Sequence, residues 1–249
     1  MTSVYIVLGA PDSGRLDLLA DLIGNLPETQ SPVRVYLTDE YSEAKANALA
    51  VDAAAEIRRW GRTPDGPPDR LFIESPETAP ETVFIVTAGR INPVDQMETL
   101  AALLPALNWQ VARVFTFIHC ALLASHPELD EWFKACLHFS DVALLTRYET
   151  VTNAWIKNFT DAHKKECNPC LIELVRKDRP ENLARILVPE ARRFSKIFDD
   201  TDPLDDMVFD EENLPDEPFD IEGKPDPYFE RLPNGFRRIS LPDICNFLP

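Results

Sequence analysis

The sequence predicts an α/β protein built on a mostly parallel sheet with helices on both faces. Two observations support this fold class. Short apolar runs rich in β-branched residues recur along the first 198 residues, and segments with helical periodicity lie between them. Strands that alternate with helices pair in parallel, so both faces of their sheet must be covered. Ligands of such sheets bind at the carboxyl ends of the strands.

The expected strands are short and apolar, as buried parallel strands are. The first, 4–8, has five consecutive apolar residues, and 33–37 and 82–86 have the same character. The full set of expected strands is 4–8, 33–37, 71–74, 82–86, 111–118, 142–145 and 171–174.

The expected helices repeat apolar residues at a spacing of three or four. Segment 15–26 does so with leucines, 42–60 is rich in alanine and has Ser42 as a plausible N-cap, and 128–138 begins after Pro127. The full set of expected helices is 15–26, 42–60, 94–107, 128–138, 153–166 and 181–198.

Charge divides the chain at residue 199. The whole chain has a formal net charge of −17. Residues 1–198 hold 21 Lys and Arg against 27 Asp and Glu, whereas residues 199–231 hold 2 against 14. This acidic stretch contains five prolines but also scattered apolar residues, so we expect an extended tail that docks on its own domain or on a partner. We therefore predict two parts: an α/β domain over 1–198 and an acidic, proline-rich tail over 199–249 that ends in a short hairpin-like piece with a strand-like run at 236–241.

Composition excludes several classes of function. A nucleic-acid binder or a protein held on an anionic membrane needs a surplus of Lys and Arg, which this chain lacks. The apolar run at 4–8 is too short for the core of a secretory signal, and no segment reaches the roughly 18 apolar residues of a membrane span. Five cysteines in 249 residues fit free thiols in a reducing compartment. We expect a cytoplasmic protein, and the sequence leaves open whether it forms a homo-oligomer.

One turn has the spacing of a phosphate-binding loop. Residues 9–16 read Gly-Ala-Pro-Asp-Ser-Gly-Arg-Leu between the first expected strand and the first expected helix. Gly9 and Gly14 are separated by four residues, as in a P-loop, and backbone amides around Ser13 would face a phosphate. However, Arg15 stands at the position of the lysine, and Leu16 at that of the hydroxyl residue that ligates Mg²⁺.

Three interpretations of this loop stay open. Asp12 adds a carboxylate that would repel phosphate. The loop is then a P-loop in shape that is chemically disabled, a weak phosphate or nucleotide site, or an unrelated glycine turn. Asp39 and Glu40 follow the second expected strand and could supply a carboxylate to such a site, although we expect them to be solvated.

Further segments resemble the CobW-type GTPases. In 84–93, an apolar strand leads into Thr87, Gly89 and Pro93, which match the family's strand-end pattern, while Val86 replaces its Glu. The strand at 142–145 leads into Thr-Arg-Tyr-Glu (146–149), where the family has its guanine-reading Asn-Lys-x-Asp. Asn168 and Pro169 fall where the family carries Asn-Pro. The resemblance covers about residues 3–198.

The resemblance implies a P-loop GTPase domain with altered chemistry. Thr87 and Gly89 take the place of the switch segment, and Thr146, Arg147 and Glu149 that of the base site. GTP hydrolysis needs a phosphate-clamping lysine, a hydroxyl ligand for Mg²⁺ and a carboxylate near the metal, so we expect little or no GTPase activity. No cofactor is expected, and GTP or GDP could bind weakly.

The family also has members that deliver metals through a Cys-x-Cys-Cys motif. Residues 38–83, where that motif would lie, contain no Cys. The chain's own weak candidates for a metal site are His163, Cys167 and Cys170, which could supply three ligands where a structural zinc needs four. Free thiols are the expected role of the two cysteines.

The sequence therefore leads to one main hypothesis and two alternatives. The main one is a catalytically disabled, CobW-type GTPase-like protein that acts as a binding or scaffold module, with the tail as its interaction element. The first alternative is a nucleotide-binding GTPase-like metallochaperone with altered motifs. The second is a structural subunit of a protein assembly.

Overall fold

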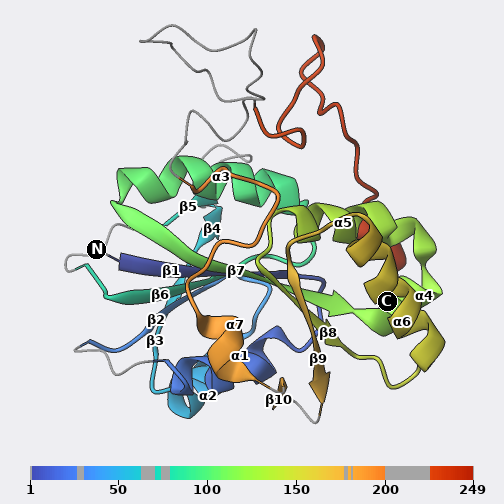
Figure 1. Cartoon of the computed structure of the whole chain (residues 1–249). Helices are drawn as coiled ribbons and strands as arrows, with labels where there is room; N and C mark the ends of the chain where they lie inside the picture. The colour runs from blue at the N-terminus through green and yellow to red at the C-terminus, as the bar shows by residue number, and fades with distance from the viewer. Residues whose placement is uncertain are drawn as a thin grey trace, which may run out of the picture.

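The computed structural model describes residues 2–26, 31–62, 71–73, 79–176, 179–180, 182–199 and 225–248. Its central feature is an eight-stranded sheet in the order β10-β9-β8-β7-β1-β6-β2-β3 (Figure 1). All neighbours pair in parallel except β10 with β9. This confirms the predicted α/β class with a mostly parallel sheet.

Six strands of this sheet fall on expected apolar runs, and the other two, at 56–59 and 179–180, were not expected. The eight strands are β1 (Thr2–Gly9), β2 (Arg34–Leu37), β3 (Glu56–Arg59), β6 (Thr82–Val86), β7 (Trp109–His119), β8 (Val142–Thr146), β9 (Leu171–Arg176) and β10 (Arg179–Pro180). A separate two-stranded antiparallel sheet joins β4 (Gly61–Arg62) to β5 (Leu71–Phe72). The central strands β1, β6 and β8 are almost wholly buried, which explains their unbroken apolar sequences.

Helices cover both faces of the sheet (Figure 1). They are α1 (Arg15–Gly24), α2 (Glu43–Asp52), α3 (Pro93–Ala106), α4 (Cys120–Ser125), α5 (Asp130–His138), α6 (Asn153–Lys165) and α7 (Leu183–Leu187), with 3₁₀ turns η1 (Pro127–Leu129) and η2 (Ile244–Phe247). One buried apolar cluster joins the sheet to α3, α4 and α5, and α6 packs against it. The other joins the opposite face to α1, α2 and α7.

Two predicted helices are shorter than expected. The helix predicted over 42–60 ends at Asp52, because Ala54 turns with φ +49° and the chain continues as strand β3. Ser42 caps α2 as predicted, accepting a hydrogen bond from the amide of Lys45.

The predicted helix over 181–198 reduces to α7. Pro189 follows two residues after its end, and proline disfavours helix in the residue before it. The next segment is instead fixed to Asp141, whose fully buried carboxylate accepts hydrogen bonds from the Arg192 amide and from the Arg193 guanidinium. The predicted strand-like run at 236–241 is also absent, and an isolated bridge joins Arg231 to Arg237 there.

The segment 225–248, here called the C-terminal arm, packs on the body on the side of α3 and α5 (Figure 1). Arg237 pairs with Asp95 and Glu98 of α3, at 2.5 and 2.6 Å. Asp226 accepts hydrogen bonds from His138 and Ser195, and Ile244 near the chain end is 1% exposed. The arm is therefore held both by ion pairs and by burial of apolar side chains.

The connections of the sheet change direction between β1 and β7, which makes this a topological switch point. The chain leaves β1 toward β2 on one side, and it leaves β7 toward β8 on the other. Ligands of open α/β sheets bind at such a switch point, beyond the carboxyl ends of the strands. The loop 9–14 follows β1 at this point. Within the described residues, no helix is long and apolar enough to cross a membrane.

Candidate functional site

The loop after β1 has the backbone shape that the glycine spacing predicts. Gly9 has φ +140° and Gly14 has φ +82°, the second as the residue that caps α1. Asp12 also has a positive φ of 55°. These left-handed positions turn the chain sharply from strand to helix, as a phosphate-binding loop requires.

Arg15, at the position of the P-loop lysine, points into the protein rather than over the loop. Its side chain is 2% exposed. Nη1 donates a hydrogen bond to the carbonyl of Thr87 at 2.5 Å, and the guanidinium lies over the ring of Tyr41 at 5.4 Å. Nη2 lies 3.4 Å from Oε2 of Glu40. The cation that would bind phosphate is thus engaged by groups of the chain itself.

Glu40 completes this arrangement. Its Oε2 atom accepts a hydrogen bond from the amide of Gly89 at 2.7 Å, and the side chain is 15% exposed. Arg90 adds a long ion pair to Oε1 at 4.0 Å. The expectation that Glu40 is solvated was therefore wrong, because the turn after β2 directs it against the turn after β6.

Gly89 is required at this point by close approach. A Cβ there would lie 2.6 Å from the nitrogen of Pro11 and 2.7 Å from Nη2 of Arg15. The loop after β1 and the loop after β6 are therefore in direct contact. The structure brings together the predicted phosphate-loop and switch-like segments, with Glu40 as the residue that joins them.

The remaining predicted loop and switch residues serve structural roles. The Ser13 hydroxyl is buried and donates to the carbonyl of Ala10 at 2.7 Å. The Thr87 hydroxyl donates to the carbonyl of Val7 at 3.0 Å. Leu16 offers an apolar side chain where a metal-binding hydroxyl would stand, and the carbonyl of Val86 accepts a hydrogen bond from the Trp60 indole. No free hydroxyl faces the loop from Ser13 or Thr87.

The base-site-like segment follows β8. The hydroxyl of Thr146 is buried and donates to the carbonyl of Ile118 at 3.2 Å, whereas Glu149 is exposed. Arg147, with φ +50°, reaches back to the loop and donates to the carbonyl of Asp12 at 3.0 Å. It also pairs with Asp17 at 3.3 Å. Arg147 thus ties the base-site-like segment to the phosphate-loop-like segment.

Two small cavities lie beside this bridge. One, of about 220 Å³, is lined by residues of the loop, α1, α2 and Tyr41. The other, of about 160 Å³, is lined by Thr146, Arg147 and Glu149 together with Ser13 and Gly14. Both are below the roughly 300–1,000 Å³ of typical ligand sites.

Burial shifts the pKa values of two titratable side chains near the site. Burial raises the pKa of Tyr41 to about 12, against the opposing effect of the Arg15 charge. Burial likewise lowers the pKa of His119, the residue at the end of β7. His119 accepts a hydrogen bond from the amide of Leu122 through Nδ1 and so caps α4. Both side chains are therefore neutral near pH 7.

The weak metal candidates do not form a metal site. His163 and Cys170 are buried, whereas Cys167 is exposed in a turn with φ +54°. Across the described part of the chain, no three or more His, Cys, Asp or Glu side chains are placed to hold a metal ion. Burial raises the pKa of Cys170 well above its usual value, so its thiol stays protonated.

Sequence reasoning missed the main role of Glu40 and the reach of Arg147. A carboxylate three residues beyond the end of β2 was the available signal for Glu40. Nothing in the sequence shows that this turn lies against the turn after β6, because the two are 49 residues apart. That contact depends on the sheet order, in which β6 lies between β1 and β2.

The strand order and the strand–loop–helix at β1 and α1 belong to a mostly parallel α/β fold. No protein-family model and no curated protein matches this sequence. The following three solved structures resemble this chain in fold.

The cell division protein FtsY of Thermotoga maritima is 15% identical with a TM-score of 0.47, covering 75% of this chain and 67% of FtsY. Hydrogenase maturation factor HypB of Archaeoglobus fulgidus is 14% identical with a TM-score of 0.42, covering 70% of this chain and 80% of HypB. The Zn(II)-bound YjiA GTPase of E. coli is 10% identical with a TM-score of 0.42, covering 76% of this chain and 61% of YjiA.

Proposed function

We propose that this chain is a catalytically disabled, CobW-type GTPase-like protein that works as a binding or scaffold module. One observation carries the proposal: Arg15, which stands at the position of the phosphate-clamping lysine, is already paired with the carboxylate of Glu40. This anion is bound to the buried Arg15 and to the amide of Gly89. A carboxylate held by a cation and a backbone amide satisfies the same groups that a phosphate would use.

The groups needed for phosphoryl transfer are absent from their positions. Catalysis of this kind depends on a metal that bridges the phosphates and on charge that stabilises the transferred group. Leu16 cannot ligate a metal, and Val86 ends the strand where the family has a carboxylate. The described residues around the loop therefore offer neither the hydroxyl nor the strand-end carboxylate.

A nucleotide would also have to displace internal contacts. Its phosphates would compete with Glu40 for Arg15, and its sugar and base would have to move Arg147 away from Asp12 and Asp17. Each broken hydrogen bond to a charged group weakens binding by about 1.5–3 kcal/mol. We therefore expect GTP or GDP to bind weakly at most, and Mg²⁺ to have no effect on affinity.

The test is a calorimetric titration of the intact protein and of matched variants. Wild type should bind GDP and Mg²⁺-GTP with Kd weaker than about 1 mM. Glu40→Ala combined with Arg15→Lys and Leu16→Ser should gain Mg²⁺-dependent binding. The first change removes the carboxylate that competes with phosphate, and the other two restore the P-loop lysine and the hydroxyl ligand for Mg²⁺. Glu43→Ala, which removes a neighbouring but largely exposed carboxylate, is the control and should behave as wild type. Micromolar, Mg²⁺-dependent binding by wild type would refute the proposal.

The acidic tail over 199–249 is the proposed interaction element; its residues 200–224 lie outside the described residues, and the C-terminal arm is its described part. Its turn carries Phe236 and Leu232, whose exposed fractions are 73% and 43%. The base of the turn is fixed by Arg231 and Arg237, which both pair with Glu98. A rigid turn that presents an aromatic side chain loses little entropy when a partner binds it. Phe236→Ser should abolish self-association or partner binding measured by sedimentation and cross-linking, and unchanged behaviour would remove this role.

A further inference from the structure

A groove of about 950 Å³ follows the first residues of β7, between the C-terminal end of α3 and the segment 189–199. β7 extends beyond β8 here (Figure 1): its pairing with β1 begins at Trp109, but its pairing with β8 begins only at Phe115. In the part of the chain that the structure describes, no strand lies against the other edge of 109–113. The groove therefore has an unpaired strand edge as one of its walls.

The hydrogen bonds of β1 show which backbone groups of β7 are free. The amide of Ser3 donates to the carbonyl of Glu81 at 2.9 Å, so Ser3 faces β6 and its neighbour Val4 faces β7. In a parallel ladder, a residue bonds to the two residues that flank its partner and not to the partner itself. Val4 lies opposite Val111, so the N–H and C=O of Val111 point away from β1, on the side of the groove.

The free edge of β7 lacks the charges that protect the outer edge of the sheet. The outermost strand on one side, β3, carries Glu56, Arg58 and Arg59, and charged side chains keep an edge strand from pairing with another chain. Residues 109–112 of β7 are instead Trp, Gln, Val and Ala. An uncharged edge with free N–H and C=O groups is a template for one more strand.

Apolar side chains line the groove on the α3 side of the sheet. Leu104 is buried, and Ile197 and Phe198 are half-buried against the same apolar cluster as Val111. Ala112, the next residue of β7, packs with the cluster on the opposite face. The groove thus surrounds the strand edge, and a strand added there would place alternate side chains against the apolar wall.

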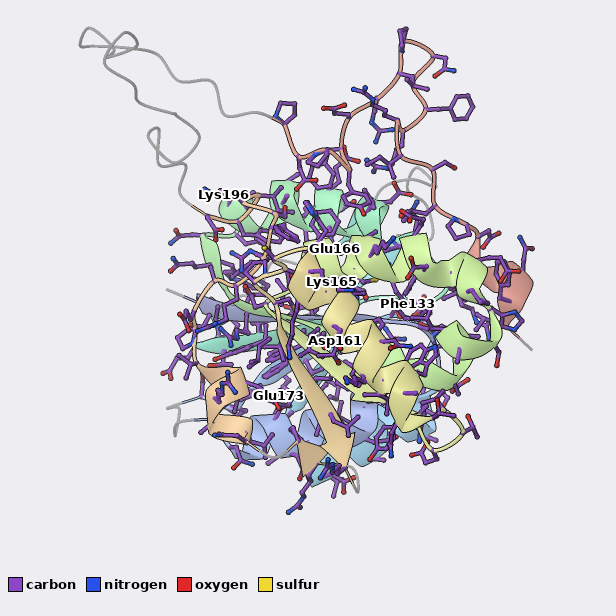
Figure 2. The ribbon with its side chains drawn as sticks, turned by 45° about the vertical axis from the view of Figure 1, so that its right-hand side comes forward. Phe133, Asp161, Lys165, Glu166, Glu173 and Lys196 are labelled. Carbon is purple, nitrogen blue, oxygen red and sulfur yellow. The ribbon has the colours of Figure 1, made fainter. Side chains whose placement is uncertain are left out.

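The chain itself leads out of this groove. Arg193, whose side chain is 2% exposed, pairs with Asp141 and Asp199, so the charges in the lining are already neutralised. Asp199 is both a wall of the groove and the last described residue before the gap at 200–224. Figure 2 shows the segment that leads there, labelled at Lys196, rising to α3. An uncharged, extended stretch of the tail is therefore the occupant that fits the groove.

One stretch of the tail has the composition of a strand. The run 204–214 is the longest in the tail without proline, which would remove a ladder N–H. Within it, residues 207–209 are Met, Val and Phe, and Val and Phe favour strands. They follow Asp199 by eight to ten residues, a reach of about 26–36 Å for an extended chain, whereas residues 109–112 span about 13 Å. The stretch is thus long enough to fold back onto β7.

From this geometry we infer that residues 207–209, which lie outside the described residues, add to the sheet as a short strand beside 109–112 of β7. Their backbone groups pair with those of Val111, and the side chains of Met and Phe lie against the apolar wall. No residue lines both this groove and the cavities beside the loop after β1. The turn of Phe236 also stays free, so this inference and the proposed function can fail separately.

The test is hydrogen exchange of the whole protein, measured by mass spectrometry on short fragments. Amides of 207–209 should exchange about tenfold more slowly than those of a synthetic peptide of residues 202–214, the effect of about 1.4 kcal/mol. Val111→Pro removes the N–H on the free edge without removing a bond to β1, and it should abolish this protection. Val111→Thr keeps the N–H and is the control, which should behave as wild type.

A pair of tail variants keeps the inference testable if Val111→Pro disturbs the body. Phe209→Ser should abolish the slow exchange of 207–209 and speed exchange at Val111, whereas Phe219→Ser, the same change elsewhere in the tail, should alter neither. Fast exchange of 207–209 in wild type, or protection that survives both Phe209→Ser and Val111→Pro, would overturn the inference. Protection that rises with protein concentration would show pairing with a second copy and would overturn it too.

Discussion

The carboxylate of Glu40 accepts a hydrogen bond of 2.7 Å from the backbone amide of Gly89. The contact joins the turn after β2 to the turn after β6, across 49 residues of sequence. With Arg15 at 3.4 Å from the same oxygen, it gives the loop an internal anion. The same carboxylate oxygen therefore contacts both the first residue of α1 and the turn after β6.

Removal of this carboxylate should destabilise the fold. In Glu40→Ala, the amide of Gly89 and the guanidinium of Arg15 each lose a partner, with an expected cost of about 1–3 kcal/mol in the free energy of unfolding. Urea denaturation measures it. Glu43→Ala removes only an ion pair whose Glu is 80% exposed, and it should change stability by less than about 1 kcal/mol. Equal effects of the two variants would argue against a structural role for Glu40.

A methyl group at Gly89 should be more damaging than one at Gly24. The Cβ of Gly89→Ala would lie 2.6 Å from Pro11 and 2.8 Å from Ala10, both backbone atoms that cannot move aside cheaply. Overpacking of this kind costs about 1–3 kcal/mol or more. Gly24, at the end of α1, has nothing within 4 Å of its added Cβ, so Gly24→Ala should be neutral or stabilising. Thermal unfolding of both variants decides the matter.

Docking of the C-terminal arm should weaken in acid. Burial alone would raise the pKa of Asp226, but hydrogen bonds from His138 and Ser195 outweigh it and hold the pKa below its usual value. A lowered carboxyl pKa means that the stabilisation is complete above the unfolded pKa of about 3.9 and is lost as pH falls through the folded value.

Two variants test the role of Asp226. Asp226→Asn should cost about 1–3 kcal/mol at pH 7 and remove the part of the acid dependence that comes from this group. Hydrogen exchange of the arm amides, such as that of Arg238, which donates to the carbonyl of Glu230, reports whether the arm keeps its structure. Glu230→Gln, in an exposed pair with Arg238, is the control and should have little effect. Exchange that is equally slow in Asp226→Asn would show that Asp226 does not hold the arm.

Thiol reactivity should divide the five cysteines into two groups. Cys167 and Cys245 are exposed, whereas Cys120, Cys136 and Cys170 are buried. Burial raises the pKa of Cys120 and of Cys136 to about 12, which leaves almost no thiolate near pH 7. A maleimide should therefore label two thiols in the native protein and five after unfolding. Labelling of a third native thiol would show that one of the buried positions opens.

Much of the fold could be predicted because local sequence determines it. The strand at 82–86 and the glycine loop after β1 depend on apolar runs and turn residues, which are readable in sequence. Strand β3 was missed because Ala-rich sequence favours helix. The turn that ends α2 has a positive φ at Ala54, a position where a glycine would have marked the end of the helix but alanine does not. The contacts of Glu40 and Arg147 depend on which strands are neighbours in the sheet. Their roles therefore could not be predicted from local sequence.

The central claim is that Glu40, bound to Arg15 and Gly89, prevents tight nucleotide binding. The most direct test is the affinity of the protein for nucleotide with and without Mg²⁺. Isothermal titration of the intact protein with GDP and GTP should show Kd weaker than about 1 mM and no dependence on Mg²⁺. The same titration of Glu40→Ala with Arg15→Lys and Leu16→Ser should show Mg²⁺-dependent binding. Tight, Mg²⁺-dependent binding by wild type, at micromolar Kd or below, would contradict the account.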